Sequence, residues 1–459
     1  MDKNQNMMQK RYGLPMAISM VVGTVIGSGV FFKASKVLES NNGSMVKSII
    51  TVASVGLIML VCAYVFSLLA ARVDKVNGLV DYSEISCGKL YAYGIGWFAA
   101  TIFYPTITSA LGWISANYII ILFGINLGWW FHYLLAMALL FLSFLFNVIS
   151  PKLSGKFQVS TTAIKLVPLA VMAIAGTIAG LVNGTTVENL TSSHSTISGG
   201  SGLFGAIIAF AFAYEGWIFA TTINSEIKDS KKNLPRALFF GAIIIISVYV
   251  LYFLGLMGVL SAEEIVSAGD DLPRRAFSAL FGSPIFGNIV YVFVVVSCIG
   301  TMNGLMLATT RGMYSIAVRG DGPMPQVFSR VNKKTDMPVA SAVFALTVCL
   351  LWVSQWQLGF INGFLPKFIS FENDELPITT FYASCIPIFI YVMRKCTDLG
   401  VIKRFVIPII ACAACAFMVF CAIYTYKIEF LYYLIVFAVI MAIGFLFYRK
   451  RDKTSEKSR

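Results

Sequence analysis

The chain has 459 residues, of which 58% are hydrophobic and only 12% are charged. Together with a mean hydropathy of +0.79, this composition excludes a soluble globular domain, a disordered chain and a disulfide-stabilised scaffold. The formal net charge of +13 does not indicate a nucleic-acid partner, because the basic residues gather in the connections on one side of the predicted membrane spans.

Long apolar runs predict an all-α membrane protein with twelve transmembrane helices, since continuous runs exclude the alternating pattern of a barrel strand. In chain order the predicted spans are 14–38, 46–71, 93–123, 128–149, 156–182, 202–224, 235–259, 284–318, 338–354, 376–393, 404–425 and 429–448. An even number of spans places both termini on one side, and most of the 35 Lys and Arg residues fall there. The positive-inside rule therefore predicts a multi-pass protein of the cell (plasma) membrane, with residues 1–13 and the basic tail 449–459 in the cytoplasm.

Nothing in the sequence predicts a metal site, a cofactor or an enzyme. The chain has nine cysteines without the paired spacing of a zinc site, and only two histidines. It contains no phosphate-binding loop and no Ser/His/Asp set. We therefore expect no catalytic residue, no cofactor and no metal.

The centre of the first span is made of poor helix formers. Within Gly23-Thr24-Val25-Ile26-Gly27-Ser28-Gly29-Val30, three glycines and a serine lie at the expected depth of the bilayer midplane. This composition predicts either an unwound segment or a small-residue face that packs against another helix. The segment alone leaves both interpretations open.

The sixth span carries a second interruption, Glu215-Gly216, directly after Phe212, Ala213 and Tyr214. A carboxylate at the centre of a lipid-facing helix costs roughly 2.5–3.5 kcal/mol, so Glu215 is expected to face a cavity or a partner. Interruptions in the first and sixth spans occupy matching positions of two five-helix halves, 14–182 and 202–393, and an odd number of spans inverts the second half. The predicted connection between the halves is an extracellular loop, 183–201, and the last two spans, in 394–448, lie outside the repeat.

Two interrupted helices that meet at the midplane predict a substrate site built from backbone groups. The freed amides are expected at Ser28, Gly29 and Val30, where the start of a helix favours a carboxylate. Freed carbonyls that would accept from an ammonium group are expected at Val25, Phe212, Ala213 and Glu215. The other residues of the predicted lining are Ile26, Gly27, Tyr214 and Gly216. Donors on one side and acceptors on the other suit an α-amino acid and leave its side chain undefined.

Lys165 lies about ten residues into the fifth predicted span, too deep for its ammonium to reach either surface easily. Three roles stay open: a fixed cation that braces helix 1 in place of a sodium ion, a group that carries a proton, or a structural ion pair with Glu215. The role of Glu215 is equally undecided, because its side chain can line the site or select a cationic substrate, or the residue can contribute only its backbone carbonyl.

Three motifs, in order along the chain, resemble the amino acid-polyamine-organocation (APC) superfamily and, within it, the bacterial L-type (LAT-type) amino-acid transporter-like permeases. Gly27-Ser28-Gly29-Val30-Phe31 is similar to that family's helix 1 motif, and the Ala213-Tyr214-Glu215-Gly216-Trp217 run to its helix 6 motif. The segment from Arg311 to Pro325 looks like the signature at the end of helix 8.

The resemblance covers essentially the whole chain and implies the LeuT fold, with a 5+5 inverted repeat, discontinuous helices 1 and 6, and alternating access. It also implies carboxylate binding at Gly27, Ser28 and Gly29, ammonium binding at helix 6 carbonyls, an aromatic gate at Phe212, and Lys165 at the position of a sodium site. Ile218 departs from the polar or acidic residue that many relatives carry there, and the acid of this chain stands instead at Glu215, which puts cationic substrates and acid-sensing chemistry borrowed from those relatives in doubt.

The sequence therefore predicts a secondary active transporter of L-amino acids, in particular neutral ones, coupled by exchange or protons rather than sodium. The expected partners are an amino acid, the lipid bilayer and, for symport, protons; whether a partner subunit exists is left undecided. One alternative is a cationic amino acid or polyamine carrier that uses Glu215. An alternative of another class is a channel or an amino-acid sensor that does not transport.

Overall fold

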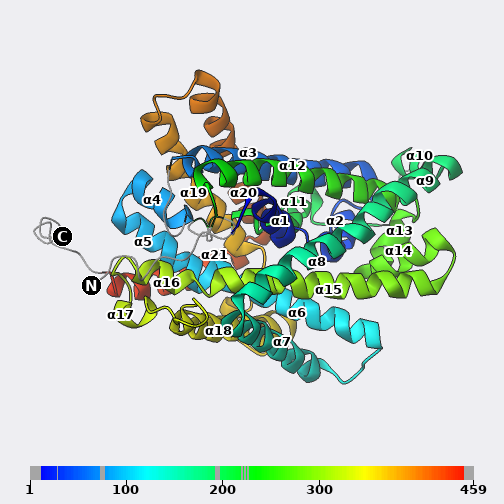
Figure 1. The fold of residues 1–459 in the computed structure, drawn as a ribbon. Coiled ribbons are helices and arrows are strands. Elements are labelled where there is room, and N and C mark those ends of the chain that lie inside the picture. Colours follow the sequence, from blue (N-terminus) through cyan, green and yellow to red (C-terminus); the bar gives the residue numbers. More distant parts are fainter. Residues whose placement is uncertain are drawn as a thin grey trace, which may run out of the picture.

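The computed structural model is a bundle of long helices that run back and forth along one direction (Figure 1). It describes residues 12–27, 29–72, 78–191, 197–218, 221, 224 and 227–448. The described part of the chain contains no β-strand, only one isolated parallel bridge between Tyr12 and Ile227. The all-α prediction is thereby confirmed.

The first half of the chain begins with α1 (Leu14–Val25) and α2 (Gly29–Ser40), which follow one another with a bend of 41°. The elements that follow are α3 (Met45–Ala70), α4 (Gly78–Cys87), α5 (Lys89–Phe98), η1 (Ala99–Phe103), α6 (Tyr104–Phe123), α7 (Trp129–Ile149), α8 (Pro151–Val171), η2 (Met172–Gly176), α9 (Thr177–Asn183) and α10 (Thr185–Thr191). The short elements η1 and η2 are π-helical turns inside otherwise continuous helices.

The second half begins with α11 (Gly202–Tyr214), which is only 13 residues long. The elements that follow are α12 (Ser230–Met257), α13 (Ala262–Ala268), η4 (Gly269–Asp271), α14 (Leu272–Phe281), α15 (Pro284–Thr309), α16 (Gly312–Ala317), α17 (Pro325–Phe328), α18 (Val339–Ser354), η5 (Gln355–Ile361), η6 (Lys367–Ile369), α19 (Leu376–Lys395), η7 (Ile402–Val406), α20 (Ile407–Tyr426) and α21 (Ile428–Leu446).

Among the described residues, ten helical stretches are long and apolar enough to cross a membrane. They are Met45–Ala70, Lys89–Phe123, Trp129–Ile149, Leu153–Asn183, Ser230–Met257, Pro284–Ala317, Val339–Ile361, Leu376–Lys395, Ile402–Tyr426 and Ile428–Leu446. The bent pair α1 and α2 makes an eleventh, and α11 is a shorter apolar helix. The stretch that matches the predicted span 93–123 begins earlier than predicted, at Lys89.

Several helix ends follow directly from local sequence. Ser44 caps α3 by accepting a hydrogen bond from the amide of Lys47, and Ser261 with Glu264 forms a capping box at the start of α13. Gly124 ends α6 in the left-handed conformation, with φ +62°, which glycine adopts without a steric penalty. These caps fix where the chain turns between helices.

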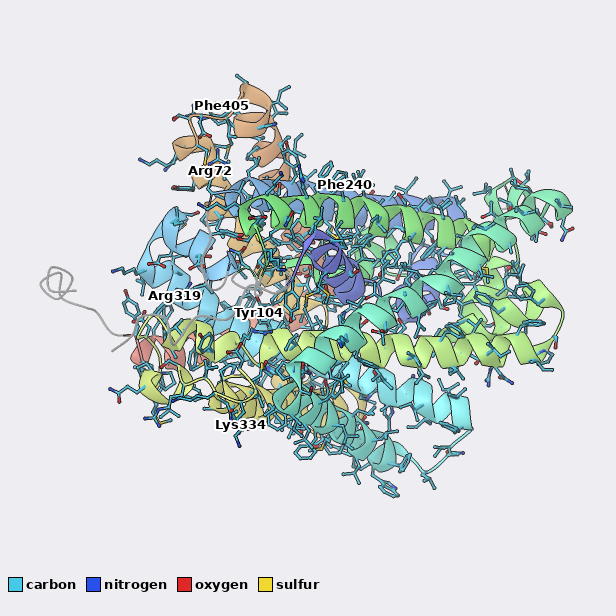
Figure 2. The ribbon with its side chains drawn as sticks, in the orientation of Figure 1. Arg72, Tyr104, Phe240, Arg319, Lys334 and Phe405 are labelled. Carbon is cyan, nitrogen blue, oxygen red and sulfur yellow. The ribbon has the colours of Figure 1, made fainter. Side chains whose placement is uncertain are left out.

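One end of the bundle is held together by polar links between segments distant in sequence, and we call it the basic end. Figure 2 shows Arg72 and Arg319 at this end, opposite the end at which Figure 1 shows α10, α13 and α14. Arg72 is 2.5 Å from Asp398, Arg319 pairs with Asp81, and the amide of Lys228 donates to the carbonyl of Tyr12 over 2.8 Å. We call the opposite end the far end.

Candidate substrate-binding site

The first helix break lies between α1 and α2, where the glycine-rich sequence predicted it. Ile26 is extended, with φ −71° and ψ 99°, so the helical ladder stops at Val25 and resumes at Gly29. Gly27 is also packed, because a side chain there would lie 2.5 Å from Thr301 on α15. The structure therefore combines the two interpretations, since the segment is both interrupted and closely packed.

The second break follows α11, where Glu215 is extended with ψ 157° and Gly216 has φ +111°. This positive φ explains the glycine, since other residues are strained there. The structure describes Trp217 and Ile218 beyond it, both buried, and only Thr221 and Asn224 of residues 219–226. The α-helical part of the predicted sixth span, 202–224, thus ends at Tyr214.

The two breaks contact each other directly. The hydroxyl of Thr24 donates to the carbonyl of Gly216 over 3.1 Å, and a side chain on Gly216 would lie 2.7 Å from the carbonyl oxygen of Thr24. On the other side of the break, a side chain on Gly29 would lie 2.5 Å from the Cα of Ala213. Glycines are therefore required for the two interrupted backbones to approach this closely.

Tyr249 on α12 links the two breaks and is a site residue that the sequence did not reveal. It is fully buried, and its hydroxyl lies 3.1 Å from the carbonyl oxygen of Val25 and 2.9 Å from that of Ala213. These are two of the carbonyls expected to accept from a substrate ammonium. Each carbonyl oxygen has a second lone pair, so both keep capacity for a further donor. A tyrosine in an apolar helix gives no local signal of this contact.

Lys165 on α8 is fully buried and reaches the first break. Its ammonium donates to the carbonyl of Gly23 over 2.5 Å and to the hydroxyl of Thr301 over 2.6 Å. Thr301 in turn lies 3.4 Å from the carbonyl of Ile26. Lys165 on α8 thus joins α1 to α15 beside the freed carbonyls. Its hydrogen-bond partners are neutral groups, so it does not form the ion pair with Glu215.

Glu215 is 3% exposed, and its carboxylate lies beside the hydroxyl of Tyr382 on α19. Its charge acts on Tyr382 and Cys385 of α19 and on Cys62 of α3. The side chain therefore lies near the interface of α11 with α3 and α19, while its backbone belongs to the second break.

Phe212 lies in the last turn of α11 and is 5% exposed. The ammonium of Lys33, on α2, lies 5.4 Å from the centre of its ring, a distance at which a cation is attracted to the π-face. Lys33 is itself only 1% exposed.

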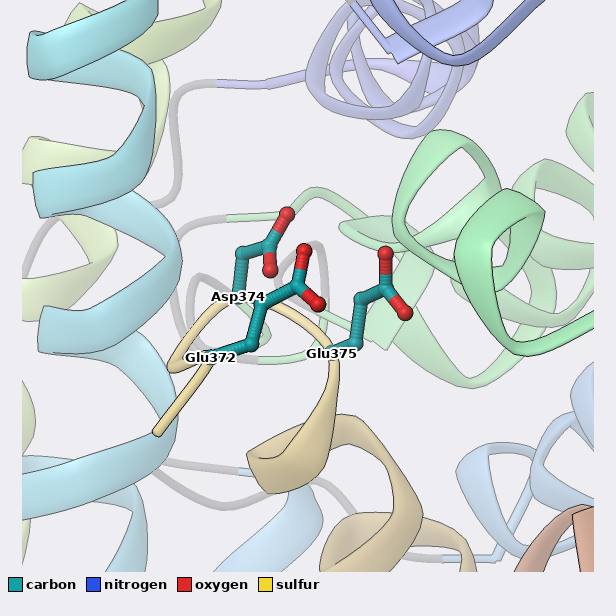
Figure 3. Close-up of side chains that lie close together, drawn as sticks. All are labelled: Glu372, Asp374 and Glu375. Carbon is teal, nitrogen blue, oxygen red and sulfur yellow. The ribbon is translucent and has the colours of Figure 1, made fainter. Parts of the chain in front are cut away.

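Lys33 belongs to a set of five charged residues that we call the charge cluster: Lys33, Lys36, Glu372, Asp374 and Glu375. The ammonium of Lys33 is 2.8 Å from Asp374 and 2.6 Å from Glu375. That of Lys36 is 2.9 Å from Glu372 and 3.2 Å from Glu375. Figure 3 shows the three carboxylates projecting from the segment before α19. Sequence reasoning missed the cluster because its two parts lie more than 330 residues apart.

A buried amide network lies beside the site, between α7, α8 and α15. The side chain of Asn147 donates to the side-chain oxygen of Asn303 over 2.9 Å, and that of Asn303 donates to the hydroxyl of Ser154 over 2.9 Å. These groups satisfy one another, which makes the network a fixed support for α15.

Most of the predicted lining meets at the two breaks. Val25, Ile26, Gly27, Gly29 and Val30 lie on the first break, Phe212 to Gly216 lie on the second, and all are buried. The amides in the first turn of α2, at Gly29 and Val30, have no acceptor within their own helix, as at every helix start. Ser28, predicted to supply one of the amides, lies outside the described residues.

Comparison with known proteins gives a consistent result. The sequence model of the family described as "Amino acid permease" matches residues 12–458. The serine/threonine exchanger SteT of Bacillus subtilis (strain 168) is 32% identical over 351 residues, which cover 76% of this chain and 78% of that protein. The large neutral amino acids transporter small subunit 2 of Oryctolagus cuniculus is 28% identical over 372 residues, 78% of this chain and 67% of the relative. The human cystine/glutamate transporter is 26% identical over 432 residues, which cover 91% of this chain and 81% of that protein.

Proposed function

This chain belongs to the amino acid permease family, a family of membrane transporters rather than enzymes, and on that premise we propose that it carries neutral L-amino acids by alternating access. The observation that carries the proposal is the contact between two broken helices, with Thr24 bonded to Gly216 and Tyr249 joining Val25 to Ala213. Transport by interrupted helices uses their freed backbone groups to bind a zwitterion.

The proposed architecture is the LeuT fold with twelve spans, in which α1 with α2 is the first span and α11 begins the sixth. The two five-helix repeats are 14–182 and 202–393, joined by loop 183–201, with 394–448 outside them. The basic end would face the cytoplasm together with segments 1–13 and 449–459, and the far end would face the exterior of the cell. The Arg72 and Arg319 links support this orientation, because basic connections stay on the cytoplasmic side.

In the proposed site the substrate carboxylate binds amides at Gly27, Ser28 and Gly29, where the dipole of α2 adds positive potential. The ammonium binds carbonyls of the second break, and Phe212 closes over the bound molecule. Tyr249 holds the two breaks at a fixed separation through its hydroxyl. The substrate side chain is then selected by the surrounding apolar residues.

The position of Glu215 supports a neutral rather than a cationic substrate. Its carboxylate lies near Tyr382, Cys385 and Cys62, on α19 and α3, whereas a carboxylate that selects arginine or a polyamine should face the first break and Phe212. The names of the serine/threonine exchanger and the large neutral amino acids transporter subunit favour the same class.

Lys165 acts in this proposal as a fixed cation that braces α1, in the place of a sodium ion. Its two short hydrogen bonds, to Gly23 and Thr301, support that role, because an ammonium held by a carbonyl and a hydroxyl supplies the positive charge that a metal would otherwise provide. Coupling would then come from exchange or from protons.

The test is uptake of radiolabelled alanine, serine, leucine and arginine into proteoliposomes, empty or loaded with the same amino acid. We expect saturable uptake of the three neutral amino acids, stimulated by internal substrate, and no effect of replacing sodium by choline. Arginine or putrescine competing better than serine would favour the cationic alternative. Binding without flux, or flux that never saturates, would indicate a sensor or a channel.

A further inference from the structure

The charge cluster is buried and yet unbalanced. It holds three carboxylates, on Glu372, Asp374 and Glu375, against the two ammonium groups of Lys33 and Lys36. When all five groups are ionised, one negative charge remains. Keeping an uncompensated charge out of water costs several kcal/mol, so a fully ionised cluster favours contact with water.

The carboxylate with the fewest partners is Asp374. Glu372 and Glu375 each contact both lysines, and the hydroxyl of Tyr426 lies within hydrogen-bonding distance of both carboxylates. Asp374 pairs with Lys33 alone, through Oδ2. Both of its oxygens are buried without a hydrogen-bond partner among the described residues, and Oδ1 also has no ion-pair partner among them.

The cluster links two segments of the chain at the far end, where α2 is bonded to α13 through Ser35 and Ile265. Lys33 and Lys36 lie on α2, directly after the first break, and the carboxylates lie in the 371–375 segment before α19. Lys33 also lies over Phe212, beside the second break. Water reaches the cluster at Lys36, whose side chain is 42% exposed.

We propose that the charge cluster binds one proton, on Asp374, and that this proton keeps the far end of the transport pathway closed. The inference rests on the proposed function, because it assigns the closed far end to a transport cycle. The proton comes from water beside Lys36, forms an O–H bond at Oδ1 of Asp374, and returns to that water on release. With the proton bound, the cluster is neutral and stable when buried; without it, the extra charge draws in water and separates α2 from the 371–375 segment.

The charged surroundings support this assignment. Burial raises the pKa of Asp374 to about 7, in opposition to Lys33. Burial acts on Glu375 in the same direction, but Lys33 and Lys36 outweigh it and lower the pKa of Glu375 to about 2. Of these two carboxylates, Asp374 is the one whose charged form is disfavoured by its surroundings.

Groups on the other packed elements face the cluster as well. The carboxylate of Asp270, on η4, interacts electrostatically with the ammonium of Lys33. The carboxylate of Glu429, at the start of α21, interacts electrostatically with that of Glu372. Tyr426, on α20, completes the surroundings. One oxygen of each of the three carboxylates lies within 4.8 Å of the others, a spacing that also suits a cation, but the ammonium of Lys33 already lies among them.

The test is the KM for external amino acid in exchange assays with equal pH inside and outside, at pH 6, 7 and 8. An external substrate binds only the fraction of molecules whose far end is open. A group with a pKa of about 7 is about one-eleventh protonated at pH 8 and about ten-elevenths at pH 6. We therefore expect the external KM to rise up to about tenfold from pH 8 to pH 6.

Two variants identify the group. Asp374→Asn copies the protonated carboxyl, so its external KM should be high and the same at every pH. Lys36→Gln removes a positive charge from a partly exposed position and should move the midpoint of the KM change to higher pH, by about one unit. Lys47→Gln and Glu188→Gln, which alter exposed residues outside the cluster, should behave like the wild type.

A second measurement does not need transport. Hydrogen–deuterium exchange in lipid nanodiscs should show faster exchange in α2 and in 371–375 for the wild type than for Asp374→Asn at pH 8, with no difference at pH 6. If this difference is found but no amino acid is carried, the proposed function fails and the proton site stands.

The proposal would be overturned by an external KM that is the same at pH 6 and 8 in active wild-type protein. An Asp374→Asn variant that keeps the wild-type pH dependence would overturn it as well. Replacement of sodium by choline should change nothing; a shift in KM on that replacement would show that the cluster takes a metal cation instead. If Asp374→Asn does not fold, an unchanged midpoint in Lys36→Gln contradicts the proposal.

Discussion

Two lysines are buried among the residues that the structure describes, and their surroundings are opposite. Lys165 donates to a carbonyl and a hydroxyl, so its charge is held by neutral groups. Lys33 lies among three carboxylates and over the ring of Phe212. The comparison teaches that burial alone does not define the role of a charged group. Lys165 fixes the geometry of the first break, whereas Lys33 belongs to a set of charges whose balance can change.

The largest expected effect is the loss of Lys33, which leaves Lys36 alone against three carboxylates. Removing one partner of a buried ion pair costs about 3–5 kcal/mol, so Lys33→Met should lower the midpoint of thermal unfolding in detergent strongly. The double variant Lys33→Met/Asp374→Asn should recover part of that loss, because it removes one unpaired carboxylate. Lys47→Met is the matched control at an exposed lysine. A Lys33→Met midpoint equal to that of the control would contradict the charge argument.

Removal of Lys165 should affect turnover more than folding. Lys165→Ala loses two charged hydrogen bonds, each worth about 1.5–3 kcal/mol, and frees the carbonyl of Gly23. We expect at least about a tenfold fall in the initial exchange rate, with normal insertion and a monodisperse elution profile. Exchange at the wild-type rate across the pH range would discard the bracing role.

Tyr249 tests the neutral link between the two breaks without changing any charge. Tyr249→Phe keeps the ring and removes the hydroxyl that contacts Val25 and Ala213. A neutral hydrogen bond contributes about 0.5–1.5 kcal/mol, so we expect a loss of about two- to tenfold in kcat/KM. Tyr64→Phe, on α3, is the control. Identical kinetics in Tyr249→Phe and Tyr64→Phe would argue against the bridge.

The smallest effect is expected at the basic end, where the ion pair of Arg72 with Asp398 is exposed to water. The side chain of Asp398 is 69% exposed, and such pairs contribute about 0–1 kcal/mol. Arg72→Gln should therefore leave the unfolding midpoint within a degree or two of the wild type, as about 0.5 kcal/mol implies. A large drop would show that this pair, like the charge cluster, is shielded from solvent.

Much of the site follows from local sequence. The weak helix formers of 23–30 allowed either a break or a packing face, and the Glu215-Gly216 pair at the matching position of the second half favoured a break in both spans. The same reasoning predicted that Lys165 must find acceptors inside the bundle. It did not identify those acceptors, since Gly23 and Thr301 lie more than 130 residues away along the chain.

Lys33 shows why the remainder could not be predicted. Near the end of an apolar run, a lysine is expected to extend toward water, and only the packing of α2 against the 371–375 segment places it among carboxylates. Tyr249 gave no signal either, because a tyrosine in a membrane helix is more often a packing residue.

The sequence by itself determined that this is an all-helical membrane protein, where two of its helices break, and which motifs it shares with amino acid permeases. These properties depend on the composition and order of residues within one segment. Only the tertiary structure decided which groups meet: Lys165 with α1, Tyr249 with both breaks, Glu215 with α19, and Lys33 with its three carboxylates. Such pairings depend on how each helix is rotated and how deeply it lies against its neighbours, and packing across the whole bundle sets both.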